Sequence, residues 1–346
     1  MCILRINLKE STMLILGIES SCDETGLALY SEGEGLIAHM VNSQVELFTE
    51  YGGVIPEIAA RDHSVKIINI LKSLLKKADK KLNDINLVAY TAGPGLIGSL
   101  MVGETVAKTI SNVLDIELLP INHLEGHILA PGLEDDNLET PYLCLLVSGG
   151  HTQIIECSDY GSYKILGETV DDACGEAFDK VGKLLNLDYP GGPKVSKLAA
   201  GGDPARFNFP RALMKDRNLN FSFSGLKTAV LYALEDLEEK DYPDVAASFQ
   251  EAVVDVLVKK LAYAIEQTGI KKLVCSGGVA ANSLLRERLT DMGKTSELEV
   301  SYPKMEFCTD NAAMIAYAGF IRKKYNLKEY PTKFARPRWP LGELYD

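Results

Sequence analysis

The sequence lacks any apolar run long enough to cross a membrane. Across its 346 residues, no window approaches the roughly 18 consecutive apolar residues that a spanning helix needs. The first twelve residues, MCILRINLKEST, also lack the long apolar run and the small-residue cleavage site of a signal peptide. We interpret residues 1–12 as an extension, with Met13 as an alternative start, and expect a soluble, cytoplasmic protein without membrane contact.

Cysteine is scarce and unpaired in the sequence. The seven cysteines are scattered, and no two of them form a C-x-x-C pair. A chain of this size does not need disulfide bonds to stabilise its core, and isolated cysteines are most often small buried residues. We therefore expect all of them to be reduced, which agrees with a cytoplasmic location.

Positive charge is also in short supply. There are 36 lysines and arginines against 48 aspartates and glutamates, so the formal net charge is −12. This balance argues against a surface coated for nucleic acid, although it leaves room for a local basic groove or a basic partner. We interpret the tail residues Arg336, Arg338 and Trp339 as a packed or flexible end, with RNA contact as the less favoured alternative.

Two common catalytic motifs are absent. The glycine-rich stretch 92–99 lies between an apolar strand and a helix, but it lacks the G-x-x-x-x-G-K-[ST] spacing of a P-loop, so tight packing of helix on sheet is its favoured use. The pair His123 and His127 lacks the glutamate that directly follows the first histidine in H-E-x-x-H zinc proteases. Glu125 comes one residue later, about 200° round a helix from His123, and should point away from the histidine face.

The histidine pair is nevertheless suited to metal binding. His123 and His127 are four residues apart, so a helix places both imidazoles on one face, where they can bind a transition metal. On spacing alone, ordinary surface or core histidines are slightly favoured. Taken alone, Asp310 is interpreted as the cap of an alanine-rich helix from Ala312, and His63 as a surface or capping residue.

A pattern of strand, small polar turn and strand occurs twice. An apolar strand at 13–16 runs into a glycine-containing turn and a second strand at 27–30, and about 130 residues later the strands 143–147 and 153–157 flank the turn 148–152. Glycine turns of this kind let backbone N–H groups approach a phosphate. The duplication, like the chain length, predicts two similar lobes that face a cleft, with two ordinary hairpins as the alternative.

Local signals predict several helices and turns. Pro56 should start a helix whose buried face follows the 3, 4, 7 spacing, and the S-x-x-E string from Ser248 should start a long buried helix. Asn282 is interpreted as a helix cap or as part of an adenosine-binding elbow. The string 189–193 is expected to be a rigid turn, and 220–228 either a core-facing strand end or an RNA contact. The buried face of the first helix would comprise Ile67, Ile68, Leu71, Leu74 and Leu75.

Many strings of the chain together resemble one protein family. In order along the sequence they are GIESSCDETG, YGGVIPEIAARDH, AGPGLIGSLMVG, NHLEGHILAP, LLVSGGHTQI, GEAFDKVGKLL, YPGGP, FSFSGLKT, SGGVAANSLLR and CTDNAAMIAYAG. They closely resemble the bacterial TsaD family, formerly described as Gcp or O-sialoglycoprotein endopeptidase. The resemblance runs collinearly from Met13 to about Gly319, nearly the whole chain.

The resemblance implies a fold and an activity. The fold class is α/β, a two-lobed actin-like, Hsp70-like and sugar-kinase (ASKHA) fold with duplicated RNase H-like subdomains. We expect residues 13–133 with 312–346 in the first lobe and residues 134–311 in the second. The implied enzyme is an acyltransferase that moves the threonylcarbamoyl group of threonylcarbamoyl-AMP to the exocyclic amine of the adenosine next to the anticodon, position 37, in tRNAs reading codons that begin with A.

The resemblance also implies binding residues. The metal ligands would be His123, His127 and Asp310, holding one divalent ion, Fe²⁺ with Zn²⁺ as the alternative. Many relatives carry an aspartate where this chain has Ser196, so Ser196 is left out of the substrate site. The family pattern does not assign a general base; Asp23 and Glu24 face the same cleft if the hairpin prediction holds. The residues carried over for the adenylate are Leu146, Val147, Ser148, Gly149, Gly150, Asp179, Gly192 and Asn282.

The implied partners and the alternatives complete the hypothesis. Besides tRNA, the family works with a homologous non-catalytic subunit, TsaB, and with a small ATPase, TsaE, which agrees with the acidic balance of the chain. One alternative is an ATPase or binding module of the same fold, which would need Mg²⁺-binding carboxylates at both hairpins and leaves the histidine pair unexplained. The other is a metallopeptidase, which would need a general base near the metal.

Overall fold

The computed structural model describes residues 13–134, 138–331 and 333–345. The expected extension 1–12, including Cys2, lies outside these residues. The six cysteines within them are all free, as the sequence predicted. In this part of the chain, no helix combines the length and the apolar character needed to span a bilayer.

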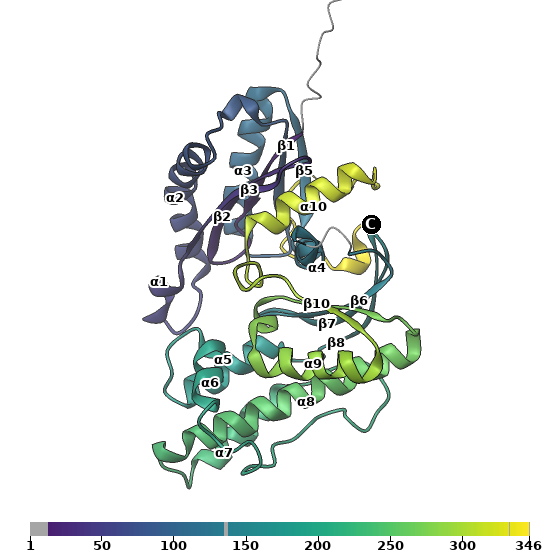
Figure 1. Ribbon diagram of the computed structural model, residues 1–346. Coiled ribbons are helices and arrows are strands. Elements are labelled where there is room, and N and C mark those ends of the chain that lie inside the picture. The colour runs from purple at the N-terminus through teal and green to yellow at the C-terminus, as the bar shows by residue number, and fades with distance from the viewer. Residues whose placement is uncertain (1–12, 135–137, 332, 346) are drawn as a thin grey trace, which may run out of the picture.

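The first sheet combines a three-stranded antiparallel meander with two parallel strands. Its order is β3-β2-β1-β4-β5, in which β1 pairs antiparallel with β2 and parallel with β4 (Figure 1). A turn joins β1 to β2 as predicted, but it comprises only residues 20–23 and contains no glycine, because Gly17 and Gly26 lie within the longer strands. The strands are β1 (Leu14–Glu19), β2 (Glu24–Ser31), β3 (Gly35–Ser43), β4 (Leu87–Gly93) and β5 (Glu117–Asn122).

The second sheet repeats this topology. Its order is β10-β9-β6-β7-β8, in which β6 pairs antiparallel with β7 and parallel with β9. Strands β6 and β7 therefore correspond to β1 and β2, which confirms the predicted duplication and the actin-like class of fold. The strands are β6 (Tyr142–Val147), β7 (Thr152–Asp159), β8 (Ser162–Glu168), β9 (Lys272–Ser276) and β10 (Glu299–Ser301).

Helices cover the two sheets separately. Helices α2 and α3 pack on one face of the first sheet and α10 on the other. The remaining long helices pack on the second sheet and on one another, below it in Figure 1. The helices are α1 (Val45–Thr49), α2 (Pro56–Lys77), α3 (Ile97–Leu114), α4 (His123–Leu129), α5 (Cys174–Leu184), α6 (Gly191–Ala199), α7 (Ser224–Leu234), α8 (Tyr242–Thr268), α9 (Ser283–Ser296) and α10 (Ala312–Lys324).

Strand periodicity explains how the first sheet serves two cores. Successive side chains of a strand point to opposite faces. Leu16 and Ile18 of β1 accordingly lie in the core that contains α2 and α3, while Ile15 lies in the core formed with α10. Gly17 also faces α10, and its missing side chain allows the helix to approach the strand closely.

The short helix α4 lies between the two sheets. It contacts β4 and β5 of the first sheet, β6 and β9 of the second, and α10 (Figure 1). Leu124 and Ile128 belong to the same core as Leu146 of β6 and Val274 of β9. The hydroxyl of Ser276, at the end of β9, donates a hydrogen bond of 2.6 Å to the carbonyl oxygen of His127. Both sheets therefore determine the position of α4.

Some predicted boundaries were wrong. Helix α8 begins at Tyr242, not at Ser248, because Pro243 supplies the stronger start signal. The hydroxyl of Ser248 lies inside the helix and bonds to the segment 203–207 instead of capping. Ile68 is 44% exposed and does not belong to the buried face of α2. The string 189–193 is a turn only in part, since α6 begins at Gly191.

The close approach of α10 to β1 generates the first prediction. A Cβ atom at Gly17 would lie 2.4 Å from the carbonyl oxygen of Ala312. We expect Gly17→Ala to lower the free energy of unfolding by about 1–3 kcal/mol, the usual cost of overpacking, as measured by urea denaturation. Gly225→Ala is the control, because a Cβ there meets nothing within 4 Å and alanine favours the helix. Equal stabilities of the two variants would contradict the packing argument.

Candidate metal centre and substrate site

Helix α4 starts directly at the end of β5. Asn122 is the last residue of the strand, and its Oδ1 accepts hydrogen bonds from the backbone N–H groups of Leu124 (2.9 Å) and Glu125 (3.3 Å). This cap makes His123 the first residue of the helix. The rings of His123 and His127 lie on one face with their centroids 4.8 Å apart, as the spacing predicted.

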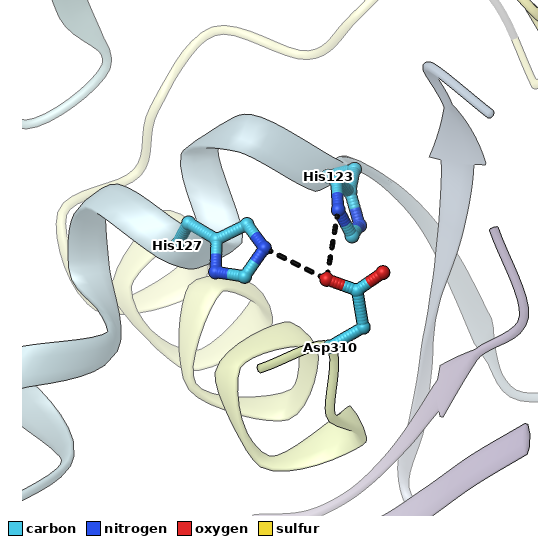
Figure 2. Close-up of side chains that lie close together, drawn as sticks. All are labelled: His123, His127 and Asp310. Carbon is cyan, nitrogen blue, oxygen red and sulfur yellow. Dashed lines mark hydrogen bonds and ion pairs between the residues drawn. The ribbon is translucent and has the colours of Figure 1, made fainter. Parts of the chain in front are cut away.

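Asp310 approaches the two histidines from the other side (Figure 2). Its Oδ1 lies 3.0 Å from Nε2 of His127 and 3.4 Å from Nε2 of His123. The prediction that Asp310 caps α10 was wrong, because the neighbouring Asn311 is the cap and accepts a hydrogen bond of 3.0 Å from the N–H of Met314. The carboxylate of Asp310 is therefore free to face the histidines.

The three residues form a cluster with the donor chemistry of a metal site. One ligand atom from each of His123, His127 and Asp310 lies within 4.8 Å of the others. Both histidines are buried, and the buried Nδ1 of His127 has no hydrogen-bond partner among the described residues. Two imidazoles and a carboxylate are suitable ligands for Fe²⁺ or Zn²⁺. The residues present thus fit one divalent cation.

The electrostatic environment of the cluster favours positive charge. Burial opposes a charge on His123, yet the carboxylates of Asp310 and Glu19 raise its pKa well above the usual range. Burial likewise opposes the negative charge of Asp310, yet the charge of His123 and its hydrogen bonds hold the pKa of Asp310 far below its ordinary value. Carboxylates that stabilise a proton here also stabilise a metal cation bound in its place.

Glu19 is a further member of this site that the sequence did not reveal. It is the last residue of β1 and is fully buried, with Oε2 3.1 Å from Nδ1 of His123. The hydroxyl of Thr91 donates to the same oxygen at 2.6 Å. Glu19 therefore directs Nε2 of His123 towards Asp310, as outer carboxylates do for metal-bound histidines. A glutamate that ends an otherwise apolar strand was the only available signal.

Glu125 points away from the histidine face, as predicted. Its side chain is fully buried and accepts hydrogen bonds of 3.0 and 3.1 Å from Nη1 of Arg322. The hydroxyl of Tyr163 donates to Oε1 at 3.0 Å, and that of Tyr330 donates to Oε2. All of these partners lie behind α4, so Glu125 joins the histidine helix to α10, β8 and the C-terminal segment.

The turn between β6 and β7 carries the predicted phosphate-binding residues. The N–H of Ser148 donates to the carbonyl oxygen of His151 at 2.8 Å, which closes the turn. The N–H groups of Gly149 and Gly150 donate to no other described residue, and a Cβ at either glycine would meet nothing within 4 Å. These two N–H groups are therefore available to an anion.

His151 connects this turn to the histidine pair. Burial, together with the charges of His123 and His127, lowers the pKa of His151 to about 4. The turn is therefore coupled electrostatically to the candidate metal ligands. The sequence analysis treated His151 only as part of the turn.

The other predicted substrate residues lie around α5 and α9. Leu146 and Val147 are fully buried within β6, so neither residue exposes its side chain or backbone to a ligand. Oδ1 of Asp179 accepts hydrogen bonds from the N–H groups of Gly191 (2.8 Å) and Gly192 (3.3 Å). The N–H of Gly175, on the first turn of the same helix, donates to the carbonyl oxygen of Ser148 at 3.1 Å. Helix α5 thus connects the glycine turn with Asp179 and Gly192.

Asn282 is a helix cap, one of its two predicted roles. Its Oδ1 accepts a hydrogen bond of 3.0 Å from the N–H of Leu285 at the start of α9. Its Nδ2 donates to Gln250 at 2.7 Å and lies 3.4 Å from Oγ of Ser196. The structure therefore brings Ser196 beside Asn282 but puts neither in direct hydrogen-bond contact with the glycine turn.

The turn between β1 and β2 faces the same region from the first sheet. Burial and the nearby charges of Asp310 and Asp23 raise the pKa of Glu24 well above its ordinary value. The charge of Asp23 also contributes to the raised pKa of Asp179, whose main cause is burial. The hydroxyl of Ser21, in the same turn, lies 3.2 Å from Nδ1 of His123, so the first turn borders the candidate metal centre.

His63 stabilises this first turn from behind. The interpretation of His63 as a surface or capping residue was wrong, because its side chain is fully buried. Its ring nitrogens lie 2.7 Å from the hydroxyl of Thr25 and 3.0 Å from the carbonyl oxygen of Cys22. The position of His63 in the middle of a long helix did not indicate these two partners, because both are distant in sequence.

The contact between Glu19 and His123 leads to a prediction about metal affinity. The neutral amide in Glu19→Gln cannot fix the ring of His123 as the carboxylate does, so the affinity for Zn²⁺ should fall by about 10- to 100-fold. Isothermal titration of the metal-free protein with Zn²⁺ would measure the change, and circular dichroism would show that the fold is retained. Unchanged affinity in a folded variant would remove Glu19 from the site.

The buried pair of Glu125 and Arg322 leads to a prediction about stability. In Glu125→Gln the guanidinium of Arg322 stays buried without its counter-charge, which should cost about 3–5 kcal/mol in the free energy of unfolding. The matched control is Glu57→Gln, which disrupts the exposed pair of Glu57 and Arg61 and should leave the stability nearly unchanged. Chemical denaturation of both variants measures the difference, and similar losses in both would contradict the argument.

Comparison with solved structures relates the fold to known proteins. HypF from T. kodakarensis matches with a TM-score of 0.64 and 15% sequence identity; the match covers 92% of this chain and 48% of the HypF chain. Full-length HypF in the phosphate- and nucleotide-bound form matches with a TM-score of 0.61 and 14% sequence identity; this match covers 91% of this chain and 47% of the HypF chain. The chain thus spans about half the length of the HypF chains. Component A of (R)-2-hydroxyglutaryl-CoA dehydratase from Acidaminococcus fermentans matches with a TM-score of 0.52 and 15% identity, over 88% of this chain and 96% of its own. At these identities the likeness concerns the fold alone.

Comparison with protein families is more specific. A sequence model of the family described as "TsaD: tRNA N6-adenosine threonylcarbamoyltransferase" matches residues 35–317. The match includes both histidines of α4, the glycine turn after β6 and Asp310, whereas Glu19, Asp23 and Glu24 precede its first residue. The chain therefore belongs to the TsaD family of tRNA-modifying transferases.

Proposed function

We propose that the protein transfers the threonylcarbamoyl group of threonylcarbamoyl-AMP to N6 of the adenosine at position 37 in tRNAs that read codons beginning with A. The observation that carries the proposal is the family match over residues 35–317, which spans the cluster of His123, His127 and Asp310. We further propose that the protein acts in the cytoplasm with a TsaB-like paralogous subunit and a TsaE-like ATPase.

The chemistry of the donor determines what the chain must supply. In threonylcarbamoyl-AMP the acyl group is joined to a phosphate, and AMP is a good leaving group, so no covalent nucleophile on the protein is needed. The requirements are positioning of the two substrates and stabilisation of the negative charge that develops on the carbamoyl oxygen. The free N–H groups of Gly149 and Gly150 support binding of the phosphate of the adenylate.

The metal cluster and the first turn complete this assignment. We propose that His123, His127 and Asp310 hold one Fe²⁺ or Zn²⁺ ion, which supplies Lewis acidity near the carbamoyl group when bound. Glu19 orients His123 for that purpose. The adenosine amine must lose a proton during transfer, and Asp23 and Glu24 on the facing turn are the two candidate acceptors.

The two alternative functions have less support. A metallopeptidase of the H-E-x-x-H type would carry its general base directly after His123, where this chain has Leu124, and Glu125 is engaged with Arg322 behind α4. A Mg²⁺-dependent ATPase of this fold would need carboxylates at both hairpin turns, whereas the second turn consists of Ser148, two glycines and His151. Neither alternative accounts for the histidine cluster and its outer carboxylate together.

One reconstituted reaction tests the proposal. The purified protein is incubated with threonine, bicarbonate, ATP, an adenylate-forming enzyme, the two proposed partners and unmodified tRNA, and the nucleosides are examined by mass spectrometry. We expect threonylcarbamoyladenosine only when the protein is present. Its absence, with adenylate formation verified, would refute the proposed reaction, while release of peptides from a protein substrate would favour the peptidase.

A double variant of the histidines tests the role of the cluster. His123→Ala with His127→Ala should remove bound metal, measured by elemental analysis, and should lower the transfer rate by about a thousandfold, the effect of losing several kcal/mol of charge stabilisation. His39→Gln is the control, since His39 pairs with Glu306 on the surface. Full transfer by a double variant that retains its fold and contains no metal would rule out the metal proposal.

A further inference from the structure

The C-terminal segment 335–338, which we name the arginine segment, is fixed to the end of β4 and to the loop that follows it. The N–H of Arg336 donates to the carbonyl oxygen of Ala92 at 2.7 Å, and the N–H of Gly95 donates to that of Pro337 at 3.2 Å. Gly93, at φ +150°, allows this close approach, because a Cβ there would collide with the carbonyl oxygen of Arg336. The prediction of a packed end is therefore correct for this segment.

The arginine segment also lies beside the candidate metal centre. The carbonyl oxygen of Trp339, the next residue, accepts a hydrogen bond of 2.9 Å from Nδ2 of Asn122, which directly precedes His123. On the other side, Leu96 donates to the carbonyl oxygen of Ser21, whose hydroxyl lies 3.2 Å from Nδ1 of His123. Two short series of contacts thus connect the segment with the ring of His123.

The two arginines of the segment have no acidic partner. In the described part of the chain, neither Arg336 nor Arg338 forms an ion pair, although the net charge of −12 makes carboxylates abundant. Arg286 bonds to backbone carbonyls, and the other arginines there all pair with carboxylates: Arg61, Arg206, Arg211, Arg217, Arg288 and Arg322. The guanidinium of Arg336 lies over the ring of Trp339, with its Cζ 5.6 Å from the ring centre, but neither guanidinium is neutralised by a carboxylate. In an acidic protein, guanidinium groups without a counter-charge indicate a site for an external anion.

A hollow and an aromatic ring accompany these charges. Ala335, Arg336, Pro337 and Arg338 line an open hollow of about 460 Å³. Phe334, the preceding residue, is 67% exposed, and Nζ of Lys108 lies 4.0 Å from the centre of its ring. The charge of Lys108 itself is paired with Glu104, whose Oε2 accepts the N–H of Ala335 at 2.8 Å, so the arginines supply the available positive charge. Cations interleaved with an exposed aromatic ring are the combination with which proteins hold single-stranded RNA, by phosphate contacts and by stacking on bases.

From these observations we propose that the arginine segment, with Phe334, binds single-stranded RNA beside the target adenosine, the arginines contacting the sugar–phosphate backbone. The inference rests on the proposed function, because it assigns the tRNA to one particular face of the site. The adenylate candidates lie on the second sheet and its helices, whereas the arginine segment lies on the loop after β4 of the first sheet. The two substrates would then approach the histidine cluster from opposite sides.

The test compares two double variants with equal loss of charge. Arg336→Gln with Arg338→Gln removes the proposed phosphate contacts but keeps the backbone hydrogen bonds of the segment. The control, Arg217→Gln with Lys240→Gln, removes two exposed positive charges that pair with Glu266 and Glu238, close to the two ends of α8 in sequence. A third variant, Arg336→Lys with Arg338→Lys, keeps both charges. Binding of an unmodified tRNA transcript is measured by fluorescence anisotropy over a series of salt concentrations.

We expect the glutamine variant of the arginine segment to bind tRNA roughly tenfold more weakly at 0.1 M salt. The slope of log Kd against log salt should fall by about 1.4, which is about 0.7 for each lost phosphate contact. The control variant should bind like the parent, and the lysine variant should recover most of the affinity. In transfer assays the KM for tRNA should rise while the KM for threonylcarbamoyl-AMP stays constant.

The results that would contradict this inference differ from the results that would contradict the proposed function. Normal tRNA affinity in a folded glutamine variant, equal weakening in the control, or a raised KM for the adenylate alone would each overturn the inference while transfer by the parent protein still supports the function. If the parent binds tRNA through these arginines but transfers nothing, the surface stands and the proposed reaction fails. A parent protein that does not bind the transcript at all overturns the inference.

Discussion

The buried ion pair of Glu125 and Arg322 joins the two helices on which the candidate metal ligands depend. Glu125 lies on α4 between His123 and His127, and Arg322 lies on α10, which Asp310 precedes. Burial opposes the charge of Arg322, but the carboxylate of Glu125 raises its pKa, so the guanidinium remains charged. A rigid, desolvated pair of this kind fixes one helix against the other. The distance between the histidines and Asp310 therefore depends on an interaction on the opposite face of α4.

The duplicated topology explains why a site forms at this place. In each sheet the first strand runs antiparallel to the second and parallel to the fourth in sequence order, so both hairpin turns leave their sheets at equivalent ends. Helix α4 lies between these ends and contacts both sheets. The two turns are specialised differently, because the first supplies Asp23 and Glu24 and the second supplies the N–H groups of Gly149 and Gly150. The same fold thus provides acidic side chains on one side of the site and free backbone N–H groups on the other.

Much of the fold and of the candidate site could be predicted from the sequence, because these features depend on local sequence patterns. The duplicated strand and turn pattern, the shared face of the histidines and the outward direction of Glu125 all follow from periods of two and 3.6 residues. What failed depended on partners distant in sequence. The sequence gives no sign that His63 is buried, because its partners Thr25 and Cys22 lie outside its helix. In the same way Glu19 has the sequence pattern of an ordinary strand end, because its partner His123 is 104 residues away. Asp310 was given the cap that Asn311 takes, because both residues are good caps and only packing selects one.

Charge provides the last connection between the site and its proposed substrates. Burial, together with the charges of Asp310, Asp23 and Glu19, raises the pKa of Glu24 well above its ordinary value. A divalent cation held by the histidines and Asp310 would offset this repulsion and favour the ionised form of Glu24, the form able to accept a proton. The same acidic centre repels polyphosphates and RNA at a distance, so the anionic substrates need local positive charge or free N–H groups at its edges. The glycine turn provides free N–H groups on one side of the acidic centre, and the arginine segment provides positive charge on the other side.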